Sequence, residues 1–350
     1  MTDDDVLPYL ERRLPAFTPT GPPTRLDGGN LNVVWRVPGA ERAVVVKYAP
    51  PYIAADPDVP LDPFRLRIEG RCLAALGPDG PLASLTGPVR TPRRYDLNTE
   101  ASVLVMEDLG ARPTLGRWLR TAEAPAVRAP ALGRALGTFI GRLHAATHGA
   151  PDLAARFDNR PMQETRHAVQ YQGVTAMLRR AGVDDATALG ARAEALGEQL
   201  LADGVCLTMG DLWPSSVLVG DETVFLIDWE LAHYGRPLQD VAHLLAHLWM
   251  QAHRAPSTAV AAAARALRRA FVDAYRSALG DREAALWTAR EHRAAAVHAG
   301  AEILVRAVGP FQDGGRYAGL APDHPAVQAA VERAATHLRA PADAALLSGD

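Results

Sequence analysis

Four charged residues of this chain occur in the order that a nucleotide-dependent phosphoryl transfer requires. Lys47 is the only lysine in 350 residues and follows an apolar run, and Glu69 lies on the next expected helix. Asp211 follows one short apolar segment, and Asp228 ends the next one. Such a reaction uses a lysine on the phosphates, a glutamate that holds this lysine, a carboxylate facing the acceptor hydroxyl, and a carboxylate on magnesium.

The environment of Lys47 indicates that its ammonium group has a specific use. The run Ala-Val-Val-Val precedes it, and Pro50 and Pro51 stop the strand soon after. Such β-branched residues predict a strand buried on both faces, where an ammonium group needs a partner. A strand-end lysine that reaches water is the alternative interpretation. Arginine, a planar fork, would not replace this compact point charge.

The segment LTMGDLWPSSVLV, followed by VFLIDWE, carries the strongest chemical signal. Asp211 lies in an expected strand-to-loop turn, and Ser216 follows where kinases usually place a magnesium-binding asparagine. Asp228 ends an apolar strand, a costly place for a carboxylate unless a cation neutralises it. Glu230, two residues further along the expected strand, would face the same side and share the magnesium ion.

A second feature of the N-terminal part is a glycine turn between two expected strands. Gly28, Gly29 and Asn30 lie in DGGNLN, and a glycine-permitted turn can bring backbone N–H groups to phosphate oxygens. Two glycines between strands are usually only a hairpin, and most helix glutamates are solvated. The functional interpretation of the turn and of Glu69 is supported by the presence of Asp211 and Asp228 further along the chain.

The elements that would position these residues predict an α+β bilobal fold. Residues 24–47 are expected to form three antiparallel strands and residues 101–110 another, with a loop at 54–63. Asp62-Pro63 predicts the start of a helix. We expect a phosphate-binding lobe at residues 1–106 with a small antiparallel sheet. A mainly helical lobe at 107–350 would carry the catalytic loop, the magnesium site and the acceptor pocket.

Further residues of the helical part have two interpretations each. Gly133, Gly137 and Gly141 form a GxxxGxxxG row, and the arginines of that segment favour close helix packing over a membrane span. His243 and His247 could lie on one helix face, but without a third ligand ordinary packing histidines are favoured. Asp240 either supports the catalytic loop or caps a helix. An acceptor-stacking role and a packing role are both open for four residues: Trp213, Trp229, His233 and Tyr234.

Composition narrows the class of protein. A formal net charge of -3 gives no electrostatic reason to expect nucleic acid or an anionic membrane as a partner. Cys72 and Cys206 lie far apart without metal-ligand spacing, which favours small core residues in a reducing compartment. The acidic N-terminus is unlike a secretory signal, and no segment approaches the length of a membrane span. We expect a cytoplasmic protein.

These motifs resemble the aminoglycoside phosphotransferase and choline kinase superfamily, and within it most closely the 5-methylthioribose kinases. The broader resemblance rests on Lys47, LVMEDL, GDLWPSS and IDWE. The narrower one rests on LDGGNLNVVWRV, KYAPPYI, RIE at 67–69, Ser216, Asp-x-Glu at 228–230 and GAEILVRAVG at 300–309.

The resemblance implies a protein-kinase-like fold that binds ATP and Mg²⁺ and transfers the γ-phosphoryl group to a hydroxyl. Adenine would lie between the lobes against the backbone of Met106, Glu107 and Leu109. It implies Lys47 as the phosphate-binding lysine. The methylthioribose kinases form homodimers, which makes a homodimer one candidate assembly here.

Three positions depart from the family pattern. The usual His-Gly-Asp is Met209-Gly210-Asp211 in this chain. Trp213 replaces the histidine of the methylthioribose kinase loop, and Val305-Arg306 replaces an Arg-Arg pair that helps to hold the sugar. The last two changes fall where the acceptor should bind, so we expect Trp213 and Arg306 to contact it.

The leading hypothesis is therefore an ATP-dependent kinase of a sugar-like or sugar-containing small molecule, such as an antibiotic or another natural product. One alternative is 5-methylthioribose kinase in sulfur salvage. A nucleotide-binding pseudokinase, favoured by Met209 and Ser216, is the other.

Overall fold

Two compact units make up the protein in the computed structural model. The first unit consists of Met1–Arg112 with Phe225–Ala232, and the second of Pro113–Val224 with His233–Asp350. The short segment Phe225–Ala232, which carries Asp228, is thus grouped with residues of the first unit. The structure describes residues 1–26, 29–121, 125–202, 204–342 and 346–347.

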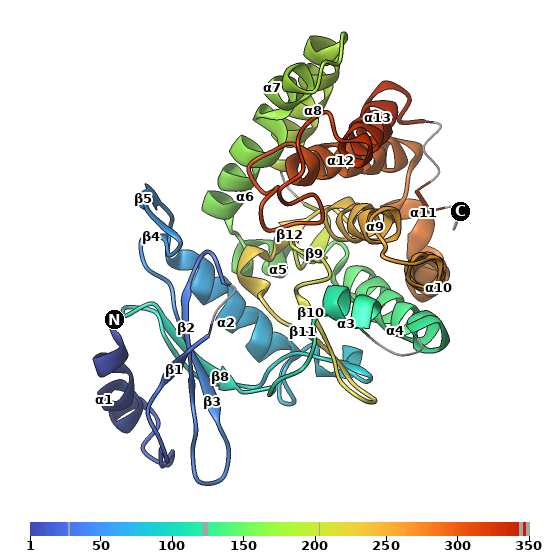
Figure 1. The fold of residues 1–350 in the computed structure, drawn as a ribbon. Helices are drawn as coiled ribbons and strands as arrows, with labels where there is room; N and C mark the ends of the chain where they lie inside the picture. The colour runs from blue at the N-terminus through green and yellow to red at the C-terminus, as the bar shows by residue number, and fades with distance from the viewer. Residues whose placement is uncertain (27–28, 122–124, 203, 343–345, 348–350) are drawn as a thin grey trace. The chain divides into compact units, whose positions relative to one another are not determined.

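The first unit is built on a five-stranded antiparallel sheet in the order β1-β2-β3-β8-β7 (Figure 1). Its strands are β1 (Thr24–Arg25), β2 (Val33–Val37), β3 (Val44–Tyr48), β8 (Val103–Glu107) and β7 (Arg94–Asn98). Lys47 on β3 lies opposite Val34 on β2 and Leu104 on β8. The strands predicted at 24–47 and within 101–110 are confirmed.

Each face of this sheet is covered by a helix. Val44 and Val46 pack in one apolar core with Leu10 of α1 (Asp3–Arg13) and with Trp35. Successive strand side chains point to opposite faces, so Lys47 faces the other side. There it meets α2 (Phe64–Leu76), which carries Glu69.

The start of α2 and the loop before it differ in detail from expectation. The Asp62 carboxylate accepts the Phe64 N–H at 2.8 Å, and Pro63 is the cap residue, so the helix begins one position later than predicted. The prediction of a loop at 54–63 is wrong in part, because β5 (Asp56–Pro60) pairs with β4 (Tyr52–Ile53) as a hairpin. All residues of β5 are exposed, and prolines are tolerated at such an edge.

Four further short elements complete the description of the strands and helices outside the mainly helical part. They are η1 (Ala83–Leu85), β6 (Val89–Arg90), β11 (Val224–Leu226) and the 3₁₀ helix η3 (Trp229–Leu231).

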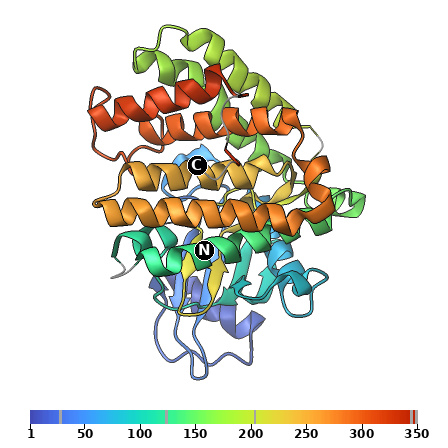
Figure 2. The ribbon, with the colours of Figure 1, turned by 90° about the vertical axis from the view of Figure 1, so that its right-hand side faces the viewer.

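The second unit is mainly helical. Figure 2 shows its long helices α10, α9, α12 and α13 side by side, with α4 next to α10. Their bounds are α4 (Pro125–Thr147), α9 (Leu238–His253), α10 (Thr258–Leu279), α12 (Ala289–Ala307) and α13 (Pro325–Arg339). The shorter helices are α3 (Leu115–Thr121), α5 (Pro151–Arg156), α6 (Arg160–Arg166), the π-helical η2 (His167–Gln172), α7 (Val174–Arg180), α8 (Ala186–Leu200), η4 (Gly280–Arg282) and α11 (Glu283–Leu286).

The glycine row of α4 allows its close approach to α10. A Cβ atom at Gly141 would lie 2.6 Å from the Tyr275 carbonyl oxygen, and one at Gly137 would overlap the Phe271 carbonyl. Real Cβ atoms do not approach so closely, so only glycine permits this contact. The packing role predicted for the row is confirmed.

Three short strands of the second unit hold the loop that contains Asp211. β9 (Cys206–Thr208) pairs antiparallel with β12 (His233–Gly235), and β10 is Val217–Val219. The Gly220 N–H donates to the Thr223 carbonyl at 2.9 Å, which closes the turn after β10. Cys72 in α2 and Cys206 are both buried, as predicted. Among the described helices, none combines the length and apolar character needed to cross a membrane.

Candidate functional site

Lys47 lies at the centre of an ion cluster in the first unit. Its Nζ atom lies 2.7 Å from Glu69 Oε2, 2.9 Å from Asp228 Oδ1 and 3.6 Å from Glu230 Oε1. The lysine side chain is only 3% exposed, so it does not reach out to water. The tertiary structure thus brings together four of the predicted site residues.

Arg65 and Asn32 complete this cluster, and the sequence reasoning missed both. Arg65 is completely buried, and its Nε lies 3.3 Å from Glu230 Oε2 and donates to Asn32 Oδ1 at 3.2 Å. Asn32 Nδ2 donates to the same glutamate oxygen at 2.7 Å. Arg65 precedes Glu69 by four residues on α2, a spacing that places both on one helix face and could have revealed it.

The cluster carries more negative than positive charge, because three carboxylates face one ammonium and one guanidinium group. Burial by itself lowers the pKa of Lys47, but Asp228, Glu230 and Glu69 outweigh it and raise this pKa well above its ordinary value. Burial raises the pKa of Glu69, Lys47 lowers it, and the other carboxylates raise it again, to about 7. A divalent cation would offset the excess charge, and carboxylate oxygens are the ligands that Mg²⁺ prefers.

Asp228 and Glu230 both approach Lys47 but differ in exposure. Asp228 has a left-handed backbone with φ 64° and ψ 58°, and η3 begins at the next residue. The strand expected through residue 230 is therefore wrong, since the chain leaves the extended conformation after Leu226. Asp228 is 47% exposed, whereas Glu230 is buried against Lys47 and Arg65. Asp228 is thus the carboxylate of this cluster that is open to a ligand.

The glycine turn is described only in part. Gly28 lies outside the described residues, while Gly29 and Asn30 are exposed. The Asn30 carbonyl accepts the Ala55 N–H at 2.9 Å, which ties the turn to the β4–β5 hairpin. The phosphate contact expected at this turn stays a prediction.

The segment expected to face adenine follows β8. Met106 and Leu109 are buried and Glu107 is half-buried. The Glu107 N–H donates to the Arg93 carbonyl at 2.8 Å, and its carboxylate accepts the Arg93 N–H at 3.1 Å. The adenine contact also stays a prediction.

In the second unit, the loop that carries Asp211 is anchored through its main chain. The Met209 N–H donates to Asp240 Oδ2 at 2.9 Å, and the Gly210 N–H donates to Oδ1 at 2.8 Å. Asp240 is completely buried, and its Oδ2 also lies 3.0 Å from His144 Nε2. Gly210 has φ 78°, which glycine adopts without strain. Asp240 therefore supports the loop even though Met209 replaces the family's histidine.

Two basic side chains hold Asp211 itself. Arg166 Nη2 donates to Asp211 Oδ1 at 2.8 Å, and His243 Nε2 lies 3.3 Å from the same oxygen. Burial by itself raises the pKa of Asp211, but the nearby His243 ring and the Arg166 charge outweigh it and lower this pKa below its ordinary value. An ionised Asp211 can orient a hydroxyl and accept its proton. No spacing pattern in the sequence pointed to Arg166.

Glu302 completes a group of three potential metal ligands with His243 and His247, and the sequence did not reveal it. Its carboxylate and ring nitrogens of His243 and His247 lie within 4.8 Å of one another, and all three residues are buried. His247 Nε2 lies 2.9 Å from Glu302 Oε1, and Arg306 Nε donates to the same oxygen at 2.7 Å. Burial lowers the pKa of His247 to about 4. Because a guanidinium group already neutralises Glu302, we interpret this group as a hydrogen-bonded ion cluster.

Trp213 and Arg306, both predicted to contact the acceptor, lie together. The Arg306 guanidinium carbon lies 4.5 Å from the Trp213 ring centroid and 5.1 Å from that of Phe311. The His247 ring centroid lies 5.3 Å from that of Trp213. The half-buried indole and the arginine form one surface on the loop of Asp211 and on α12.

Ser216 is buried within the same loop. Its hydroxyl accepts the Trp213 N–H at 3.1 Å and lies within hydrogen-bonding distance of the carbonyls of Asp211 and Trp213. The structure therefore gives Ser216 a part in closing the turn, and the expected magnesium contact stays a prediction.

Three predicted acceptor residues lie in packing positions. Trp229 is fully buried in the first unit, and its indole N–H donates to the Leu226 carbonyl at 3.1 Å. His233 is buried in β12 of the second unit. The Tyr234 hydroxyl accepts the Ala150 N–H at 2.8 Å. For these three side chains, the structure favours the packing alternative.

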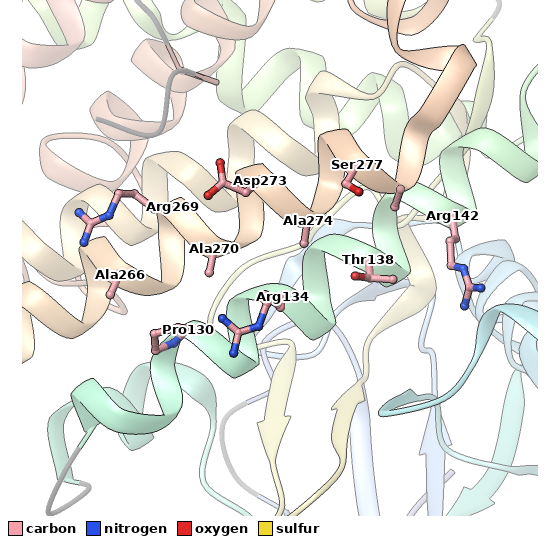
Figure 3. A pocket seen from close by; sticks show the side chains of 11 residues that line it. Pro130, Arg134, Thr138, Arg142, Ala266, Arg269, Ala270, Asp273, Ala274 and Ser277 are labelled. Atoms are coloured by element: carbon pink, nitrogen blue, oxygen red, sulfur yellow. The ribbon is translucent and has the colours of Figure 1, made fainter.

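A groove in the second unit is lined by residues other than those predicted from the sequence. It has a volume of about 820 Å³ and lies between α4 and α10 (Figure 3). Its charged lining residues are Arg134, Arg142, Arg269 and Asp273. It contains none of the residues predicted from the sequence, so we place the candidate site at the Lys47 and Asp211 clusters.

Similar proteins are kinases of small molecules. The chain is 27% identical to a 4-hydroxytryptamine kinase of Psilocybe cyanescens over 72% of this chain and 74% of that protein. It is 26% identical to a methylthioribose kinase of Exiguobacterium sibiricum over 65% of this chain and 61% of that protein.

Solved structures show the same fold at low sequence identity. Choline kinase LicA from Streptococcus pneumoniae matches with a TM-score of 0.52 and 13% identity, over 96% of this chain and 98% of that chain. The aminoglycoside phosphotransferase APH(2")-IIa, solved with streptomycin and ATP, matches with a TM-score of 0.50 and 12% identity, over 96% and 97%. The fold is thus the α+β, protein-kinase-like fold that the sequence predicted.

A comparison of the sequence with models of protein families identifies the family. The model of the phosphotransferase enzyme family matches residues 23–287, which include Lys47, Asp211 and Asp228. The chain therefore belongs to the phosphotransferase enzyme family, and it is a small-molecule phosphotransferase with a hydroxyl group as acceptor.

Proposed function

We propose that the protein is an ATP-dependent, Mg²⁺-using kinase of a sugar-like or sugar-containing small molecule. The observation that carries this proposal is the buried ammonium of Lys47, held at 2.7 Å by Glu69 and at 2.9 Å by Asp228. A lysine with a glutamate partner on a neighbouring helix is the arrangement that kinases use to hold the α- and β-phosphates.

The proposed roles divide between the two units. In the first unit, Lys47 binds the phosphates, Glu69 orients Lys47, and the exposed Asp228 holds Mg²⁺. When bound, the cation neutralises charge on the transferred phosphoryl group. In the second unit, Asp211 orients the acceptor hydroxyl. A bond forms between the acceptor oxygen and the γ-phosphorus, the bond to the ADP oxygen breaks, and the hydroxyl proton passes to Asp211.

Trp213 and Arg306 support an acceptor of neutral or anionic character. An indole face offers stacking to a flat or sugar ring, and a guanidinium group favours oxygen-rich or anionic groups. Arg306 is already paired with Glu302, so this carboxylate is not free to bind a polycation. This arrangement fits an aminoglycoside poorly.

A second candidate acceptor is 5-methylthioribose. Arg306 keeps one arginine of the pair in the corresponding helix, and the 26% identity to methylthioribose kinase supports this candidate. The identity to 4-hydroxytryptamine kinase and the Trp213 ring make a hydroxylated aromatic amine a further compound to test.

The test is magnesium-dependent formation of ADP and of a phosphorylated product by the purified protein. The acceptor panel contains methylthioribose, other pentoses, nucleoside antibiotics, aminoglycosides and 4-hydroxytryptamine. We expect turnover with one class, lost in Lys47→Met and Asp211→Asn and kept in the control Asp221→Asn, an exposed aspartate. Binding of ATP without turnover on any acceptor would overturn the proposal in favour of a pseudokinase.

A further inference from the structure

The two carboxylate oxygens of Asp211 have different surroundings in the second unit. Oδ1 accepts from Arg166 at 2.8 Å and lies 3.3 Å from His243 Nε2. For Oδ2, the described residues supply no hydrogen bond, and the Asp211 side chain is 20% exposed. Oδ1 thus accepts one hydrogen bond and lies close to a buried imidazole nitrogen that has no hydrogen bond of its own, whereas Oδ2 accepts none from the described residues.

His243 is itself held by a buried chain of hydrogen bonds. Its Nδ1 lies 3.3 Å from His298 Nε2, and His298 Nδ1 lies 2.7 Å from the Tyr171 hydroxyl. The tyrosine hydroxyl can donate to His298, whose other ring nitrogen then donates to His243 Nδ1. With the hydrogen bonds in that direction, the proton of His243 is on Nε2, the atom 3.3 Å from Asp211 Oδ1.

These three hydrogen-bonded side chains are shielded from water, so solvent does not compete for their ring nitrogens. His243, His298 and Tyr171 are each at most 2% exposed. Burial lowers the pKa of His298 well below its ordinary value, so this histidine is neutral and keeps one donor and one acceptor nitrogen. Glu302 also faces His243 Nδ1, at 3.7 Å, which is beyond hydrogen-bonding distance.

We propose that His243 is a positioning residue that, with Arg166, commits Oδ1 of Asp211 and thereby presents Oδ2 to the acceptor hydroxyl. This inference rests on the proposed function of Asp211. Kinases of this kind depend on an aligned hydroxyl, and a carboxylate that can rotate presents either oxygen at random. The Tyr171–His298 pair fixes the imidazole, as partners of an orienting histidine do elsewhere.

Two substitutions at His243 separate positioning from packing. His243→Gln keeps a side-chain N–H near the place of Nε2, whereas His243→Leu fills similar space without a donor. We expect His243→Leu to lower kcat about tenfold or more with little change in the KM for ATP, and His243→Gln to recover most of the loss. The control is His337→Leu, which removes another buried histidine, on α13. Equal kcat losses in the Gln and Leu variants, with folding shown intact by circular dichroism, would overturn the inference.

A nuclear magnetic resonance measurement tests the same geometry without an acceptor. Long-range ¹H–¹⁵N spectra of ¹⁵N-histidine protein report which ring nitrogen carries the proton. We expect a protonated Nε2 on His243, with a shift that changes in Asp211→Asn while that of His337 does not. A bare Nε2, or no response to Asp211→Asn, would overturn the proposed contact. Absence of turnover alongside the expected spectra would instead count against the proposed function of Asp211.

Discussion

The Nζ atom of Lys47 lies 2.9 Å from Oδ1 of Asp228, although the two residues are 181 positions apart in the chain. The contact joins β3 to the segment that follows β11, and both belong to the first unit. The residues proposed to hold the phosphates and the cation therefore meet in one compact unit.

Lys47→Arg should inactivate the enzyme although it keeps the charge. The buried site holds one ammonium group among three carboxylates, and the larger planar guanidinium does not fit there. We expect kcat/KM to fall on the order of a hundredfold, equivalent to about 3 kcal/mol. The control is Arg36→Lys, at an exposed pair with Asp108 that should contribute only about 0–1 kcal/mol. Wild-type kinetics in Lys47→Arg would show that charge alone suffices.

Glu69 should make the free energy of unfolding fall as the pH rises, the opposite of the usual behaviour of a carboxylate. Its pKa is raised from 4.5 to about 7 in the folded protein, so the folded state binds a proton that the unfolded state has lost between these values. Its contribution is therefore present below pH 4.5 and is lost as the pH rises through 7. In denaturant unfolding across this range, Glu69→Gln should gain stability relative to the wild type as the pH rises. The exposed control Glu222→Gln should run parallel to the wild type; parallel curves for Glu69→Gln would contradict the assignment.

Substitutions at Asp228 should separate its charge from its backbone conformation. Asn tolerates the left-handed region, so Asp228→Asn should fold normally but lose magnesium-dependent turnover. Asp228→Val should also lose about 1–2 kcal/mol of unfolding free energy, because a β-branched residue is strained at φ 64°. Urea unfolding and ADP formation with and without EDTA would measure both effects. Turnover in Asp228→Asn that EDTA still abolishes would place the metal on other ligands.

Gly137→Ala should destabilise the second unit, against the helix propensities. Alanine in a helix interior is about 1 kcal/mol more favourable than glycine. Here the new Cβ would overlap the Phe271 carbonyl of α10, and such overpacking costs about 1–3 kcal/mol. Thermal unfolding should show a lower Tm than the wild type. A higher Tm would mean that α4 and α10 separate readily.

The sequence alone predicted much of the local structure and chemistry. Strand patterns at 24–47 and 101–110, the helix with Glu69 and the glycine row of α4 all follow from side-chain periodicity and close packing, which are local properties. Lys47 stood out because it is the sole lysine and comes directly after an apolar, β-branched run. The family also followed from local motifs, since GDLWPSS and IDWE are contiguous in the chain.

Tertiary structure decided which of these groups meet. Arg65 and Asn32 reach Glu230 only because the chain folds them into one buried cluster. Asp228 is half exposed and Glu230 is buried, because the backbone turns left-handed at Asp228 and the strand does not continue. Arg166, His243 and Glu302 come from three helices that no sequence pattern relates. Ion pairs and hydrogen bonds act over a few ångströms in space, whereas periodicity reports only neighbours along the chain, so the partners of Lys47 and Asp211 could not be predicted in full from sequence.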